Sequence, residues 1–188
     1  MFLHQMGVTM GTYQRFPAHN EWSHFEWEDA VLSEPLCEAI ARSESGGDPH
    51  GLIDSYVRIR ARRAAGKPWG VKTPFLLPFL DSLRTACSGA GEKLTIVLTE
   101  RDYKETVGSL RRQSSHLSEF DRGSVFPKML KIQDVLAEHW TGASEDAEVF
   151  HLKDTLEYPR MAAKRLANLA GIEADLDKAI RGFRGRGL

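Results

Sequence analysis

Residues 94–112 read LTIVLTERDYKETVGSLRR, an apolar, β-branched run that gives way to a charged segment. The run from Leu94 to Leu98 predicts a buried parallel strand. Arg101 follows at the carboxyl end of that strand, which is where ligands lie in open α/β sheets. Asp102 can cap a helix over residues 102–113. This order of elements predicts a parallel sheet with a ligand site at the edge that carries Arg101.

Two further polar residues of this segment can meet the same ligand. Ser109 lies about two helical turns after Arg101, and Arg112 lies about one turn further. Arginine forks and a hydroxyl group that converge on one point suit a phosphate. The residues leave a second interpretation open, in which Arg101 pairs with a surface carboxylate and Ser109 faces solvent.

The rest of the chain alternates between short apolar runs and helical periodicity. Strands are expected at 69–73, 93–99 and 148–153, and helices at 28–43, 52–65, 76–88, 102–113, 127–140 and 159–170. Residues 1–29 are expected to be irregular, residues 114–126 to form a loop, and the end of the chain to be a short basic tail. The helix at 28–43 is expected to have one apolar face, formed by Val31, Leu32, Leu36 and Ile40. The helix at 52–65 is expected to have a basic face, formed by Arg58, Arg60, Arg62 and Arg63. Strands that alternate with helices predict an α/β fold, a parallel sheet with helices on both faces, in one domain over residues 1–188.

Composition limits the classes of function. The 188 residues are 41% hydrophobic, which is enough for one core, and the net charge of −1 gives no general attraction to nucleic acid or to an anionic membrane. A run of about 18 apolar residues and the features of a signal peptide are both absent, so we expect a cytoplasmic protein without a membrane partner. Cys37 and Cys87 have no metal-ligand spacing and are expected to be reduced thiols.

The segment from Arg101 to Ser109 resembles the 3′-phosphate-binding segment of the sulfotransferases, enzymes that use 3′-phosphoadenosine 5′-phosphosulfate (PAPS). Residues 69–74, WGVKTP, are similar to the WGxKDP segment of bacterial and phage sulfotransferase-like proteins. Thr73 stands where those proteins usually have aspartate, and Phe75 where arginine is common. Residues 20–29 and 147–171 resemble two more segments of the family, so the similarity is collinear over residues 3–175.

The resemblance implies a three-layer, P-loop kinase-like sulfotransferase fold with PAPS as cofactor. Arg101 and Ser109 would bind the cofactor through its 3′-phosphate. Lys72 would stabilise the charge that develops on the sulfonate, and Glu28 would act as the base. Each of the last two residues has a structural alternative, since Lys72 can be a surface lysine and Glu28 can simply favour the N-terminus of a helix.

One part of the family pattern is not found. Sulfotransferases begin with a strand and a glycine-rich loop that binds the 5′-phosphosulfate, whereas residues 3–11 match best the end of the helix that follows this loop. The resemblance therefore implies a fold that is missing its first strand, which lies in the middle of the family's sheet. Without this strand, the edges of its two neighbours have no partner. We expect them to be paired through a rearranged sheet, a homo-oligomer or further residues at the N-terminus.

The function that follows is transfer of a sulfuryl group from PAPS to a hydroxyl or amine of a small-molecule, glycan or lipid acceptor. Two alternatives remain. One is a non-catalytic binding or assembly module, supported by the missing loop and by Thr73 and Phe75. The other is a nucleotide kinase-like P-loop protein, which needs a glycine-rich loop followed by Lys-Ser or Lys-Thr that the sequence lacks. No metal site is expected.

Overall fold

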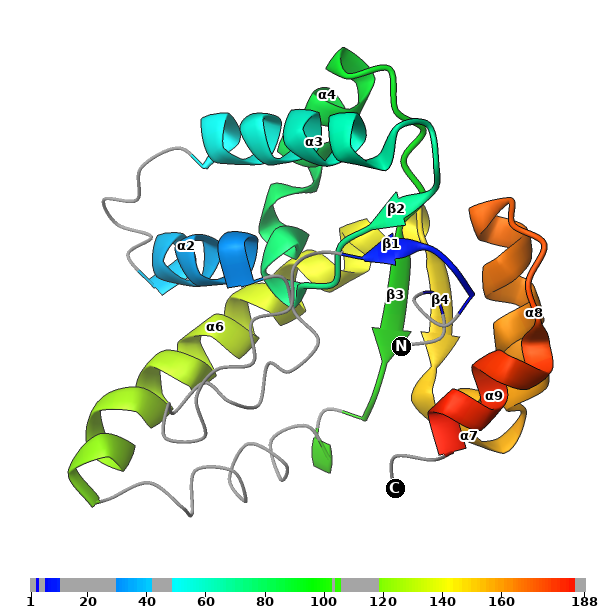
Figure 1. The fold of residues 1–188 in the computed structure, drawn as a ribbon. Helices are drawn as coiled ribbons and strands as arrows, with labels where there is room; N and C mark the ends of the chain where they lie inside the picture. The colour runs from blue at the N-terminus through cyan, green and yellow to red at the C-terminus, as the bar shows by residue number, and fades with distance from the viewer. Residues whose placement is uncertain are drawn as a thin grey trace.

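The structure is a computed structural model that describes residues 3, 6–10, 30–41, 49–102, 104–105 and 119–184. This part of the chain is mixed α/β and mostly helical, with two small parallel sheets (Figure 1). The strands are β1 (Thr9–Met10), β2 (Trp69–Gly70), β3 (Val97–Glu100) and β4 (Glu148–His151). The helices are α2 (Ala30–Ala41), α3 (His50–Ala64), the 3₁₀ helix η2 (Pro74–Phe79), α4 (Leu80–Gly89), α6 (Glu119–Glu145), α7 (Leu152–Glu157), α8 (Pro159–Ala170) and α9 (Leu176–Arg184). The prediction of an α/β protein is confirmed at this level.

Each sheet consists of one pair of parallel strands. β1 pairs with β2 over two residues, and β3 pairs with β4 from Val97↔Glu148 to Glu100↔His151. Within the described residues no ladder joins β2 to β3. The predicted bounds of the strands are therefore wrong, because a strand extends only as far as its partner does. β3 begins at Val97 and ends at Glu100, so Arg101 follows it directly.

β1 lies in a segment that was expected to be irregular. Leu3 is helical, and Gly7 (φ +92°) has the left-handed conformation that ends a helix. The amide of Val8 donates to the carbonyl of Leu3 at 3.0 Å, the bond that closes a Schellman motif. The chain then extends into β1. A strand of two residues is too short for sequence alternation to reveal it, which explains the wrong prediction.

The pair β3–β4 has an apolar cluster on each face. Leu98 and Val149 pack into the larger cluster, with residues of α2, α3, η2, α4 and α6. Val97 and Phe150 pack into the smaller cluster, with residues of α8 and α9. Figure 1 accordingly shows β3 and β4 between α6 on one side and α8 with α9 on the other. Because side chains alternate between the two faces of a strand, these four residues contribute to both clusters.

α8 has the bounds that the sequence predicted. Pro159 occupies its first turn, and Gly171 (φ +62°) follows its last residue in the left-handed conformation. The amide of Ile172 donates to the carbonyl of Ala167 at 3.1 Å and completes the C-terminal cap. Proline at the start and glycine just past the end are the strongest signals that a sequence gives for helix bounds, so both ends were predictable.

Other helices depart from the prediction. The helix expected at 76–88 is divided into the 3₁₀ helix η2 and α4, which begins at Leu80. α6 begins at Glu119, so Pro127 lies inside it and residues 119–126 are not a loop. α7 follows β4 directly where a longer strand was expected, and α9 replaces the expected tail. In α9, Ala179 is fully buried and Ile180 packs against the smaller cluster. Among the helices in the described ranges, none combines the length and apolar character needed to cross a membrane.

The carboxylate of Asp175 caps the N-terminus of α9. Its Oδ1 accepts a hydrogen bond from the amide of Lys178 at 2.9 Å. This bond, assisted by the charge of Arg181, lowers the pKa of the Asp175 carboxyl below its ordinary value of 3.8. A carboxyl whose pKa is lower in the folded state stabilises the fold above its unfolded pKa, and this contribution is lost as the pH falls through the folded pKa.

Replacement of Asp175 with asparagine keeps a capping oxygen and removes the charge. We expect Asp175→Asn to lower the melting temperature at pH 7, and the difference from the wild type to shrink as the pH is lowered toward 3. Thermal unfolding followed by circular dichroism between pH 7 and pH 3 measures this. A difference that stays constant over this range would show that the charge of Asp175 contributes nothing.

Candidate functional site

Arg101 lies at the carboxyl end of β3, as predicted. Its Nε is 3.2 Å from Oε2 of Glu105, and 39% of its side chain is exposed. Oδ1 of Asp102 accepts a hydrogen bond from the amide of Glu105 at 3.1 Å, which is the predicted cap of the next helical turn. The surface carboxylate that the second interpretation assigned to Arg101 is therefore present. It contacts only Nε, and within the described residues Glu105 is the only carboxylate paired with Arg101.

The carboxyl ends of β3 and β4 also bring together a carboxylate and an imidazole. Glu100 and His151 are the last register pair of the ladder. Oε2 of Glu100 is 2.5 Å from Nδ1 of His151, and both side chains are substantially exposed. The carbonyl of His151 accepts a hydrogen bond from Oγ1 of Thr155 at 3.0 Å, which ties the end of β4 to α7. Sequence reasoning missed this pair, because only the register of β3 against β4 makes the two residues neighbours.

Lys72 lies two residues beyond the end of β2, and its side chain is exposed. The residues that depart from the family pattern beside it have structural roles. Oγ1 of Thr73 accepts a hydrogen bond from the amide of Phe75 at 3.3 Å and caps η2. Phe75 is only 5% exposed and belongs to the larger core cluster. The other two predicted site residues, Glu28 and Ser109, lie outside the described residues.

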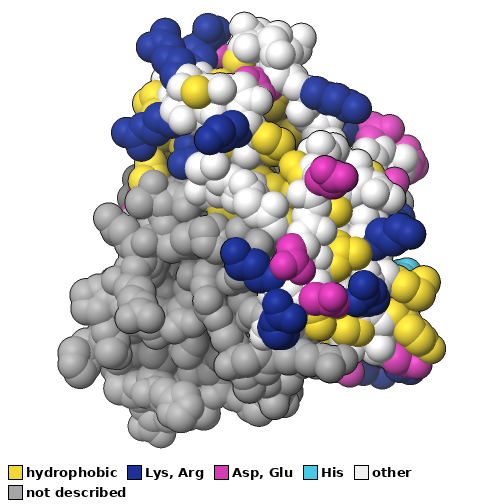
Figure 2. All heavy atoms as spheres, turned by 45° about the vertical axis from the view of Figure 1, so that its right-hand side comes forward, with side chains coloured by type: hydrophobic (Ala, Val, Ile, Leu, Met, Phe, Trp, Pro, Cys, Tyr) yellow, Lys and Arg dark blue, Asp and Glu magenta, His cyan; other side chains and the backbone are white. Residues whose placement is uncertain are grey.

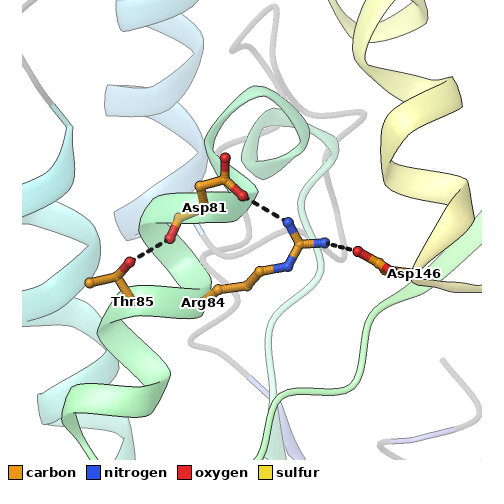
Figure 3. A network of polar contacts seen from close by, with 4 residues as sticks. All are labelled: Asp81, Arg84, Thr85 and Asp146. Carbon is orange, nitrogen blue, oxygen red and sulfur yellow. Dashed lines mark hydrogen bonds and ion pairs between the residues drawn. The ribbon is translucent and has the colours of Figure 1, made fainter.

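A hollow of about 520 Å³ lies at the opposite end of the strands, lined by residues of 94–96 and 145–148 together with Arg84 and Leu169. Figure 3 shows how its one guanidinium is held. Arg84 donates to Oδ1 of Asp81 at 2.8 Å and to Oδ2 of Asp146 at 3.1 Å, and so links α4 to the turn before β4. Two carboxylates already neutralise Arg84, and this end carries none of the predicted site residues. The hollow is therefore not the candidate site.

Arg60 departs from its expected position on a basic face of α3. It is 7% exposed, and its Nη2 donates to the carbonyl of Thr9 in β1 at 3.3 Å. Its Nε is buried and has no hydrogen-bond partner in the part of the chain that the structure describes. The neighbouring Arg58, Arg62 and Arg63 are exposed. Arg60 therefore belongs to the contact between α3 and β1, and the basic surface of α3 is smaller than the sequence indicated.

The surface carries charges of both signs. Figure 2 shows Lys and Arg side chains over the upper part of the molecule, where α3 and α4 lie, and a mixture of both signs lower down. Within the described residues, no three His, Cys, Asp or Glu side chains gather closely enough to hold a metal ion. Cys87 is a buried thiol whose pKa is raised by burial and by the nearby charge of Glu92, which leaves it little thiolate character.

The carboxyl ends of β3 and β4 thus gather a guanidinium, an imidazole and two carboxylates, all accessible to solvent. Such a group can bind an anion through its two nitrogen-bearing side chains or exchange a proton through the imidazole. In comparisons with known proteins, no family, curated protein or solved structure matches this chain.

Proposed function

We propose that this protein is sulfotransferase-like and binds the 3′-phosphate of PAPS and of adenosine 3′,5′-bisphosphate through Arg101. The observation that carries the proposal is the position of Arg101 directly after β3, exposed, at the carboxyl end of a parallel strand pair. Ligands of open α/β sheets bind at this edge. Glu105 contacts only Nε of the guanidinium, so the N–H donors of its other two nitrogens can bind a phosphate.

The arrangement of the strands supports the same proposal. The described strands form the pairs β1–β2 and β3–β4, both parallel. Two such pairs are what a P-loop kinase-like sheet would leave if its central strand were removed. The helical turn at Leu3 and the glycine at Gly7 also agree with residues 3–11 as the end of the family's first helix. We therefore propose that the two strand pairs belong to a three-layer, P-loop kinase-like fold.

When bound, PAPS would supply the sulfuryl group that passes to an oxygen or nitrogen of the acceptor, with adenosine 3′,5′-bisphosphate as the leaving group. Arg101 and Ser109 would hold the 3′-phosphate and so orient the cofactor. Lys72, exposed just past β2, would meet the negative charge that develops on the sulfonate. Glu28 would take the proton that the acceptor loses.

A non-catalytic binding module is the second candidate, and one observation favours it. Thr73 caps η2 and Phe75 packs in the core, at the two positions where similar proteins usually have aspartate and arginine. Both positions therefore serve the fold. On this reading Arg101 binds the bisphosphate, and no sulfuryl transfer follows.

Calorimetric titration with adenosine 3′,5′-bisphosphate, with ATP as the comparison ligand, tests the proposed function. We expect the wild type to prefer the bisphosphate, whereas a nucleotide kinase-like protein would prefer ATP. Arg101→Ala is expected to weaken binding of the bisphosphate by about 2 kcal/mol, roughly 30-fold, because it removes a charged hydrogen-bond partner.

Arg58→Ala is the matched control. Arg58 is also an exposed arginine paired with a carboxylate four residues away, since its Nε is 2.8 Å from Oδ2 of Asp54, but it lies on α3. We expect this variant to bind the bisphosphate as the wild type does. Equal affinity in Arg101→Ala and the wild type would overturn the assignment of Arg101. An assay for sulfuryl transfer from PAPS to candidate acceptors would distinguish an enzyme from a non-catalytic binding module.

A further inference from the structure

We propose that His151 is a second ligand of the phosphate bound at Arg101, and that Glu100 positions its ring. This inference rests on the proposed function and extends it to residues on a second strand. It follows from the ladder between β3 and β4, which places the last residue of each strand side by side. Neighbouring strands lie about 4.8 Å apart, and Arg101 directly follows Glu100, the register partner of His151. β3 ends at Glu100, and Arg101 pairs with Glu105 four residues later. Arg101 therefore no longer follows the alternation of the strand, and its side chain can reach the same phosphate as that of His151.

Glu100 fixes which ring nitrogen of His151 is available. With Oε2 of Glu100 at 2.5 Å, the N–H group at Nδ1 donates a hydrogen bond to the carboxylate. Nε2 is then the one ring nitrogen left to meet a ligand. A carboxylate that holds one ring nitrogen while the other binds is how proteins orient histidine toward metal ions, and the same geometry serves an anion.

The contact with phosphate needs one proton between the two groups. Either Nε2 carries that proton and faces a phosphate dianion, or the phosphate monoanion carries it and donates to Nε2. The total charge and the number of protons are the same in both descriptions. The hydrogen bond is charge-assisted in the first description, which makes it one of the stronger polar contacts available at a protein surface.

The described surroundings of His151 leave room for this contact. Its side chain is 59% exposed, and that of Glu100 is 43% exposed, so a ligand reaches Nε2 without a change in the core. The backbone of His151 is held on both sides, by the ladder with β3 and by the bond from Thr155. Among the described residues, Glu105 is the one carboxylate that contacts Arg101, through Nε at 3.2 Å, and the other donors of the guanidinium can meet the phosphate.

Two ligands that differ by one phosphate test the proposal. Adenosine 3′,5′-bisphosphate carries the 3′-phosphate, and adenosine 5′-monophosphate lacks it. Calorimetric titration of His151→Gln is expected to show about tenfold weaker binding of the bisphosphate, the size of one hydrogen bond to a charged group. Binding of the monophosphate is expected to be unchanged.

His139→Gln is the matched control. His139 is an exposed histidine on α6 whose Nδ1 is also held, 2.9 Å from the carbonyl oxygen of Val135, so it also leaves Nε2 available. This variant is expected to bind both nucleotides as the wild type does. Equal losses in the two histidine variants would mean that the effect does not come from the β4 edge, and would overturn the proposal.

A spectroscopic measurement separates phosphate contact from a structural role. In ¹⁵N-labelled protein, the Nε2 resonance of His151 is identified by its absence from the spectrum of His151→Gln. This resonance should shift when the bisphosphate is added and stay in place when the monophosphate is added. In Glu100→Gln, this shift and the affinity for the bisphosphate should both decrease, because the ring is no longer fixed by a carboxylate.

The outcomes distinguish the two proposals. If the bisphosphate binds and depends on Arg101, while His151→Gln binds as the wild type does and Nε2 does not shift, the role of His151 is wrong and the proposed function stands. If the wild type binds no bisphosphate, both proposals are overturned.

Discussion

Leu36→Ala should lower the free energy of unfolding by about 3 kcal/mol, because it removes a fully buried side chain and leaves a cavity. Leu36 lies on α2, which packs against η2 and α6 in the larger core. Urea unfolding followed by circular dichroism gives the change in free energy from the midpoint and slope.

Leu156→Ala on α7 is the matched control for this prediction. The residue type is the same, but Leu156 is 38% exposed, so a loss below about 1 kcal/mol is expected for a partly exposed leucine that leaves no closed cavity. If both leucine variants lost the same free energy, α2 would not be packed in the core as described.

Phe150→Ala should cost about 3–4 kcal/mol, since it removes the aromatic side chain of β4 from the smaller core. Phe150 is 6% exposed, and the guanidinium of Arg165 lies 4.7 Å from the centre of its ring. The substitution therefore removes a cation–π contact together with buried apolar area. Urea unfolding measures the loss, and Tyr158→Ala, which changes a 52% exposed aromatic residue, is the control.

The two core variants together test the prediction of a single domain. Leu36 and Phe150 belong to different clusters, but both clusters pack against β3–β4. A single cooperative transition that shifts in both variants is expected if the strand pair couples the two cores. Two transitions, each shifted by only one of the variants, would show two separate folding units.

The elements that the sequence predicted well are those whose signals are local. α8 is marked by Pro159 and Gly171, and both act within one turn of the helix ends. The apolar face predicted for α2 is buried at Leu32, Leu36 and Ile40, whereas Val31, which was predicted to share it, is 56% exposed. The helical period identifies a face well, but not its width.

The errors in the fold occur where a distant segment decides the local structure. Residues 94–96 have the composition of a strand, but β3 begins at Val97, where β4 supplies a partner. β1 has only two paired residues, and its partner β2 lies much later in the chain. Pro127 was expected to begin a helix, and instead lies inside α6, whose later residues Ile132 and Leu136 are anchored in the core. Packing overrides local preference in such cases.

The same distinction between local and distant signals applies to the candidate site. The position of Arg101 after an apolar run could be predicted, because it depends on contiguous residues. The contact between Glu100 and His151 could not, because it depends on the register between two strands that the sequence does not specify. The sequence also indicated an exposed Arg60, since a basic residue among other basic residues favours a surface, whereas its guanidinium reaches the backbone of β1.

The long crossover between β3 and β4 has a consequence for the order of folding. The two strands pair across about 50 residues of chain, and closing so large a loop has an entropic cost that grows with its length. α6, with 27 residues, fills half of that crossover, and a helix forms in about a microsecond without any distant partner. We therefore expect α6 to form early and the β3–β4 ladder late. The carboxyl edge that carries Arg101 and His151 is then among the last parts of the molecule to be assembled.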